Sequence, residues 1–217
     1  MSGGTPTVVV WDMGGIFRRY FTEVLLDVGR DLGWPVGRMP LGPTGEVPDA
    51  DYAAMDAGEL AEREYLARIL GLLHDEEIDY DPKHDPDWKQ EERPEVWALI
   101  REIHASPLRQ AVLTNDATAW LGERWWETWP HRDLFDAVVD AETIGVRKPA
   151  PEAFRHVLGV LGVQAADAVF VDDMRVNCHG AEEVGMHSHW FDIRDPRGSV
   201  DMLRARLGLG DAAEETP

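Results

Sequence analysis

Short apolar runs alternate with helical patterns along most of the chain. The run from Val8 to Trp11 is rich in β-branched residues, ends at Asp12, and is followed at once by Gly14-Gly15. A run of this kind is typical of a strand that is buried on both faces. By the same reasoning we predict four further strands, at residues 110–114, 135–139, 168–171 and 187–191.

Apolar residues at helical spacing predict the helices of the chain. We expect them at residues 18–32, 52–73, 95–104, 118–129, 151–161, 177–184 and 200–207, with a candidate break at Gly58. Residues 33–49 are rich in Gly and Pro and should form a loop. Residues 74–93 are acidic, contain prolines, and are expected to form a long loop or a weak helix.

The order of these elements indicates the fold class. Strands that alternate with helices favour right-handed βαβ units and a parallel sheet. About 100 mostly helical residues separate the first predicted strand from the second, which is too many for one crossover. We therefore predict an α/β fold: a Rossmann-like core (1–17 and 93–210), an inserted small helical cap (18–92) and a disordered tail (211–217).

Composition narrows the classes of partner. Hydrophobic residues make up 44% of the 217 residues, which is enough for a packed core, while the formal net charge is −20. This charge argues against a nucleic-acid partner, although a bound cation can still create a local site for a small anion. One cysteine, Cys178, excludes an intrachain disulfide, and the apolar run at 8–11 is too short to cross a membrane. We expect a soluble cytoplasmic protein, monomeric or homodimeric, that binds neither nucleic acid nor membrane.

Polar residues follow three of the predicted strands. They are Asp12, Thr114-Asn115 and Asp172-Asp173, and ligands of open α/β sheets bind beyond such carboxyl ends. A carboxylate here can attack phosphorus, and further carboxylates can hold Mg²⁺. Lys148, one of only three lysines, could bind phosphate oxygens together with the hydroxyl and amide groups.

Four segments resemble, in order and spacing, the four motifs of the haloacid dehalogenase-like (HAD) superfamily. They are VVVWDMGG (8–15), LTN (113–115), GVRKPAP (145–151) and VFVDDMRVNCHGAEEVG (169–185). The first motif is most similar to the branch with Asp-x-Gly-Gly or Asp-x-Gly-Asn, which includes sugar-phosphate phosphatases similar to α-glucose-1-phosphate phosphatase. The resemblance implies a Mg²⁺-dependent hydrolase that removes phosphate from a small phosphorylated metabolite through an aspartyl-phosphate.

The resemblance also implies roles for individual residues. The catalytic residues would be Asp12 as the nucleophile, with Thr114 and Lys148. The metal would be held by Asp12, the Gly14 carbonyl and Asp173, with Asp172 and Asn177 acting directly or through water. The substrate would contact Gly15, Arg18, Thr114, Asn115 and Lys148.

The chain departs from the family pattern at Gly14. Most phosphatases of the superfamily have a second aspartate there, which protonates the leaving oxygen and then activates water; such help is typically worth about 10²–10⁴-fold in rate. Three interpretations stay open. In the first, another group replaces the acid or the leaving group needs little help; Asp116 is one candidate, although a role as a helix N-cap suits it better. In the second, the protein is a 2-haloacid dehalogenase. In the third, it binds a phosphorylated ligand with little or no turnover.

Several residues have simpler explanations. The Asp172-Asp173 pair could cap the next helix, although a cap explains one acid better than two. His187 and His189 share one face of a strand, and we favour a structural role for them over metal binding. Cys178 is expected to be a small packing residue.

Overall fold

A parallel five-stranded sheet organises the molecule. The computed structural model describes residues 4–80, 92–115 and 117–210. Its strands lie in the order β3 (Ala137–Asp140), β2 (Arg109–Thr114), β1 (Val8–Trp11), β4 (Ala168–Asp172) and β5 (His187–Trp190), and every neighbouring pair is parallel. This confirms the predicted α/β Rossmann-like class. The predicted tail at 211–217 and residue Asp116 lie outside the described residues.

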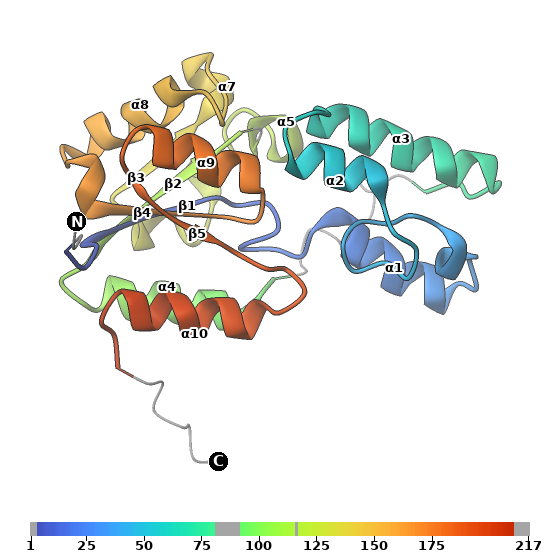
Figure 1. Cartoon of the computed structure of the whole chain (residues 1–217), viewed down its shortest axis with the longest axis horizontal. Coiled ribbons are helices and arrows are strands. Elements are labelled where there is room, and N and C mark those ends of the chain that lie inside the picture. The colour runs from blue at the N-terminus through green and yellow to red at the C-terminus, as the bar shows by residue number, and fades with distance from the viewer. Residues whose placement is uncertain (1–3, 81–91, 116, 211–217) are drawn as a thin grey trace.

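Strand β1 is apolar throughout because it lies at the centre of the sheet. Val8 and Val10 pack into one apolar cluster, whereas Val9 and Trp11 pack into another on the opposite face. Figure 1 shows the helices of these two layers, with α4 (Pro94–His104) and α10 (Pro196–Arg206) on one side of the sheet and α8 (Pro151–Leu161) and α9 (Arg175–Glu183) on the other. A strand covered on both faces needs apolar side chains at every position.

The register of the sheet aligns the polar strand ends. Trp11 of β1 lies opposite Val112 of β2 and Val171 of β4. Asp12 therefore follows β1 at the level where Asp172 ends β4, and β2 extends to Thr114 at the same edge. This is the edge at which ligands bind in open α/β sheets.

Three helices lie between β1 and β2 in sequence and to one side of the sheet in space (Figure 1). We call them the cap helices: α1 (Phe21–Asp31), α2 (Ala50–Asp56) and α3 (Glu62–Asp75). A 3₁₀ turn, Val36–Arg38, interrupts the predicted loop after α1. The bounds of an inserted cap at 18–92 stay a prediction.

The helix predicted at 52–73 is broken where the sequence contains Gly58. This residue adopts φ +80° in the turn between α2 and α3, and it packs closely against Val176 of α9. A Cβ at position 58 would meet the Val176 side chain at 2.6 Å, so glycine allows the cap helices to approach the core here.

Elsewhere the element boundaries differ from the prediction for local reasons. The helix predicted at 118–129 is divided by a turn at Gly122 into α5 (Ala117–Leu121) and α6 (Trp125–Thr128). The helix predicted from residue 18 begins only at Phe21, where Glu23 accepts the Tyr20 N–H in a capping box. The remaining short elements are α7 (Ala141–Ile144) and the 3₁₀ turns Arg132–Leu134 and Ala165–Asp167.

None of the helices in the described parts of the chain combines the length and apolar character that a membrane span requires.

Candidate active site

Three aspartates converge at the carboxyl edge of the sheet. One oxygen each of Asp12, Asp172 and Asp173 lies within 4.8 Å of the others, and all three residues are 9% exposed or less. Among the described residues, this is the one cluster of three or more acidic, histidine or cysteine side chains with metal-ligand spacing. Buried like charges are costly unless a cation or donors compensate them.

Lys148 supplies one compensating charge. Its Nζ donates to Asp12 Oδ1 at 2.6 Å and to Asp172 Oδ2 at 2.8 Å, and the side chain is buried. The Asn115 side chain holds this segment, because its Oδ1 accepts the Lys148 N–H and its Nδ2 donates to the Lys148 carbonyl. Asn115 thus positions the lysine in this structure, and its expected contact with substrate stays a prediction.

Burial is the largest single influence on the pKa values of Asp12 and Lys148. It raises the pKa of Asp12 to about 7; the Lys148 ammonium opposes this shift, while the Asp172 charge adds to it. Burial acts to lower the pKa of Lys148, but the charges of Asp12 and Asp172 outweigh that effect and raise it above its usual range. Lys148 therefore stays an ammonium beside the two acids.

The neighbouring aspartates of β4 have different surroundings. Asp172 is fully buried and accepts hydrogen bonds from Lys148, from the Met174 N–H at 2.8 Å and from Asn177 Nδ2 at 3.1 Å. Asp173 Oδ2 is equally buried but has no hydrogen-bond donor. Asp172 thus accepts the N–H of Met174, the residue before α9, although no side chain caps the first turn of that helix, and Asp173 is left as an acceptor open to a cation.

The turn after β1 brings backbone close to these acids. Gly15 adopts φ +68°, and a Cβ at this position would collide with the carboxylate of Asp173. Arg93 braces the turn: its Nε donates to the Gly15 carbonyl at 2.7 Å, and its guanidinium pairs with buried Glu23 at 2.6 Å. Arg93 was not among the predicted site residues, because it stands at the end of a predicted loop where no spacing or motif marks it.

Two connected pockets open beside Asp12. The inner pocket has about 360 Å³ of empty space, including space open to solvent, and is lined by Asp12, Gly14, Tyr20, Glu62, Thr114, Asn115, Lys148, Asp173, Met174 and Asn177. The outer pocket, with about 710 Å³ of empty space open to solvent, shares Gly14, Tyr20, Glu62 and Thr114 with it and adds Met13, Gly15, Arg18, Arg19, Phe21, Leu66, Ala117 and Leu121. Strand ends and cap helices therefore form one continuous site, which contains every predicted site residue except Asp172, fully buried behind it.

Two other residues considered for chemistry, His189 and Cys178, make contacts outside the two pockets. His189 Nε2 lies 2.9 Å from the Ser199 carbonyl, and burial lowers the pKa of this imidazole to about 4. Cys178 is buried beneath the site, with its Sγ 3.6 Å from the Asp172 carbonyl, and burial raises the pKa of its thiol. Neither residue lines the two pockets.

The chain is similar to known phosphatases and dehalogenases. Phosphatase MT3486 of Mycobacterium tuberculosis is 28% identical over 99 residues, which are 46% of this chain and 46% of that protein. A HAD phosphatase from Thermococcus onnurineus superposes with a TM-score of 0.54 at 18% identity, over 95% of this chain and 100% of that one. L-2-haloacid dehalogenase from Xanthobacter autotrophicus superposes with a TM-score of 0.53 at 24% identity, over 84% of this chain and 76% of that one.

These similarities concern the fold and the family. The chain spans about half or less of the length of the curated relatives it matches. Phosphatases and dehalogenases share the fold, so the superpositions do not separate their reactions. The model of the haloacid dehalogenase-like hydrolase family, however, matches residues 9–185 and thus most of the sequence. The chain belongs to the haloacid dehalogenase-like hydrolase family.

Proposed function

We propose that this chain is a Mg²⁺-dependent phosphatase that hydrolyses a small phosphate ester through an aspartyl-phosphate on Asp12. The observation that carries the proposal is the charge balance at the strand ends. Three buried carboxylates face one ammonium, that of Lys148, which leaves a charge of −2 when all the acids are ionised. A divalent cation would neutralise this charge, whereas a dehalogenase has no need of one.

The donor set suits Mg²⁺, which prefers oxygen ligands. Asp12, Asp173 and the Gly14 carbonyl would hold the ion directly, because Asp173 Oδ2 has no other partner. Asp172 is already bound to Lys148, Met174 and Asn177, which favours an indirect role for it. When bound, the ion would supply positive charge against the phosphoryl oxygens.

The remaining chemistry belongs to side chains of the inner pocket. Lys148 binds Oδ1 of Asp12, so Oδ2 is the oxygen that can attack phosphorus. As this bond forms, the ester P–O bond breaks and the leaving oxygen takes a proton. Water then attacks the aspartyl-phosphate and releases phosphate. Thr114 and Lys148 would bind the phosphoryl oxygens, and the cap helices limit the access of bulk water.

The lining of the outer pocket bears on the substrate. Its walls are formed largely by the apolar side chains of Met13, Phe21, Leu66, Ala117 and Leu121, with Arg18 and Arg19 contributing positive charge. This lining favours a phosphate ester whose organic part is at least partly apolar. Sugar phosphates, which the resemblance of the first motif suggested, belong in the same test.

Release of inorganic phosphate tests the proposal. The panel should contain sugar, nucleotide, aryl and alkyl phosphates, each assayed with Mg²⁺ and with EDTA. We expect release with Mg²⁺ only, and Asp173→Asn should bind Mg²⁺ more weakly in a thermal-shift titration. No release from any ester would refute the proposal; binding of esters without turnover would then support a ligand-binding protein, and EDTA-resistant halide release from a 2-haloacid would support a dehalogenase.

A further inference from the structure

Hydrolysis through an enzyme carboxylate requires two proton transfers. The leaving oxygen must receive a proton in the first step, and the attacking water must lose one in the second. Position 14 lines both pockets, but Gly14 has no side chain to do this. A proton carrier must therefore come from another part of the site.

Most of the described residues that line the pockets are unsuitable. Asp12 is the nucleophile and Asp173 the open cation ligand of the proposed reaction. Lys148 is held between Asp12 and Asp172. Burial raises the pKa of Tyr20 well above its usual range, so this phenol cannot act as a base near neutral pH. Arg18 and Arg19 do not lose a proton in proteins.

Glu62 differs from all of these in chemistry and position. It is the first residue of α3, half-buried, and it lines both the inner and the outer pocket. It lines the inner pocket together with Asp12 and Asp173, which come from the strand ends. Its charge is near enough to contribute to the raised pKa of Asp173 and of Tyr20. A carboxyl group of the cap helices thus shares the pocket of the nucleophile and also lines the outer pocket, where the organic part of the substrate would lie.

We propose that Glu62 is the general acid and base of this enzyme. In the first step its carboxylic acid protonates the leaving oxygen as Asp12 attacks phosphorus and the ester bond breaks. In the second step the resulting carboxylate takes a proton from water as the water oxygen attacks phosphorus and the bond to Asp12 breaks. Glu62 is then protonated again. The inference rests on the phosphatase function proposed above.

Leaving groups of different quality give a specific test. An alkyl phosphate has a poor leaving group that needs a proton, whereas 4-nitrophenyl phosphate has a good one that needs little help. We expect Glu62→Gln to lower kcat/KM about 10²–10⁴-fold for the alkyl ester and under about tenfold for the aryl ester. Glu62→Asp should recover part of the loss. Glu64→Gln changes an exposed acid in the same helical turn and should match the wild type.

The phosphoenzyme supplies a second measurement. If Glu62 activates water, Glu62→Gln should accumulate acid-stable, base-labile phosphate on Asp12 after a rapid quench, because formation from the aryl ester is less impaired than hydrolysis. Equal loss for both esters, a change confined to KM, or wild-type activity would overturn this role. If the wild type neither releases phosphate nor forms a phosphoenzyme, the proposed function fails, and the proposal for Glu62 fails with it.

Discussion

The two sides of the active site are built differently. On the core side, Asp12 and Asp172 are buried at strand ends, and both bind the buried Lys148, which precedes α8. On the cap side, Arg18, Arg19, Glu62 and Leu66 are half-buried and come from the chain after β1 and from α3. The core side therefore groups buried charged side chains, whereas the cap side supplies half-buried charged and apolar ones. Under the proposed function, the core would carry the phosphorus chemistry and the cap helices would select the substrate.

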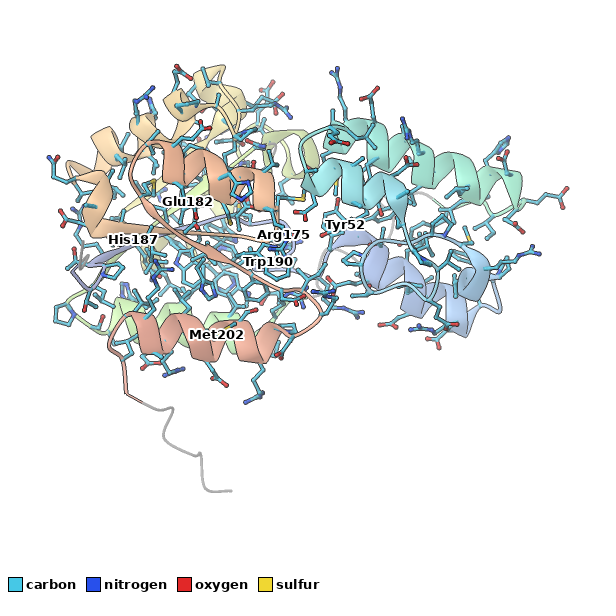
Figure 2. The ribbon with its side chains drawn as sticks, viewed as in Figure 1. Tyr52, Arg175, Glu182, His187, Trp190 and Met202 are labelled. Atoms are coloured by element: carbon cyan, nitrogen blue, oxygen red, sulfur yellow. The ribbon has the colours of Figure 1, made fainter. Side chains whose placement is uncertain are left out.

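At the far edge of the site, the two sides meet through polar contacts. Asp56 at the end of α2 accepts the Arg175 N–H at 2.6 Å and pairs with its guanidinium at 3.4 Å. Arg175 lies over the Trp190 ring at 3.4 Å, and Figure 2 shows both residues with Tyr52 where the core meets the cap helices. Exposed ion pairs of this kind contribute about 0–1 kcal/mol. Buried apolar side chains of the cap helices and of the core also belong to one cluster, so the two sides are joined by more than these pairs.

The largest effect should follow from the nucleophile on the core side. Asp12→Asn removes the attacking carboxylate, and we expect phosphate release to fall about 10³-fold or more, since the residue forms the covalent intermediate. Circular dichroism should show a folded protein. Activity within tenfold of the wild type would break the assignment of chemistry to the core.

Lys148→Met tests the charge balance of the core side. Without the ammonium, Asp12 and Asp172 are left buried and unpaired, and removing one partner of a buried pair typically costs about 3–5 kcal/mol. Urea unfolding in the absence of Mg²⁺ measures this loss. Arg18→Met is the control from the cap side and should stay within about 1 kcal/mol of the wild type; equal losses would contradict the comparison.

We expect the unfolding free energy to depend on pH through a core residue that lies away from the active site. Burial lowers the pKa of His189 in β5 from 6.5 to about 4, so its contribution to stability is present above pH 6.5 and is lost as the pH falls toward 4. Two and a half pKa units correspond to at most about 3 kcal/mol. The wild type should thus lose more unfolding free energy between pH 7 and 4.5 than His189→Gln does. Identical slopes in the wild type and His189→Gln would refute the prediction.

The smallest effect should come from the apolar wall of the cap side. Leu66→Ala shortens a side chain of the outer pocket, and we expect KM for an apolar aryl phosphate to rise about fivefold with kcat unchanged, a loss of about 1 kcal/mol. Steady-state kinetics measure both constants. Leu70→Ala, one helical turn later and 41% exposed, should leave both constants unchanged. A fall in kcat for Leu66→Ala would show that the cap side also controls the chemistry.

The sequence by itself determined the fold class and the residues of the core side. Buried parallel strands require continuous apolar runs, and the polar residue after each run is visible as a break in the pattern. Because the carboxyl ends of parallel strands share an edge, the convergence of Asp12, Thr114 and Asp172-Asp173 follows from topology alone. The scarcity of lysine and the motif order then indicated Lys148.

Only the tertiary structure decided the rest, because it depends on contacts between distant residues. Arg93 braces the turn at Gly15 across 78 residues, and its partner Glu23 is 70 residues away. Asp172 accepts hydrogen bonds from Lys148 and Asn177, whereas Asp173 Oδ2 has no hydrogen-bond partner. This difference depends on how Lys148 and Asn177 approach the two acids. Glu62 belongs to no motif, and its place in the same pocket as Asp12 depends on how the cap helices pack against the core. Local patterns carry no signal for such pairings, because each residue taken alone is compatible with a solvated helix or loop.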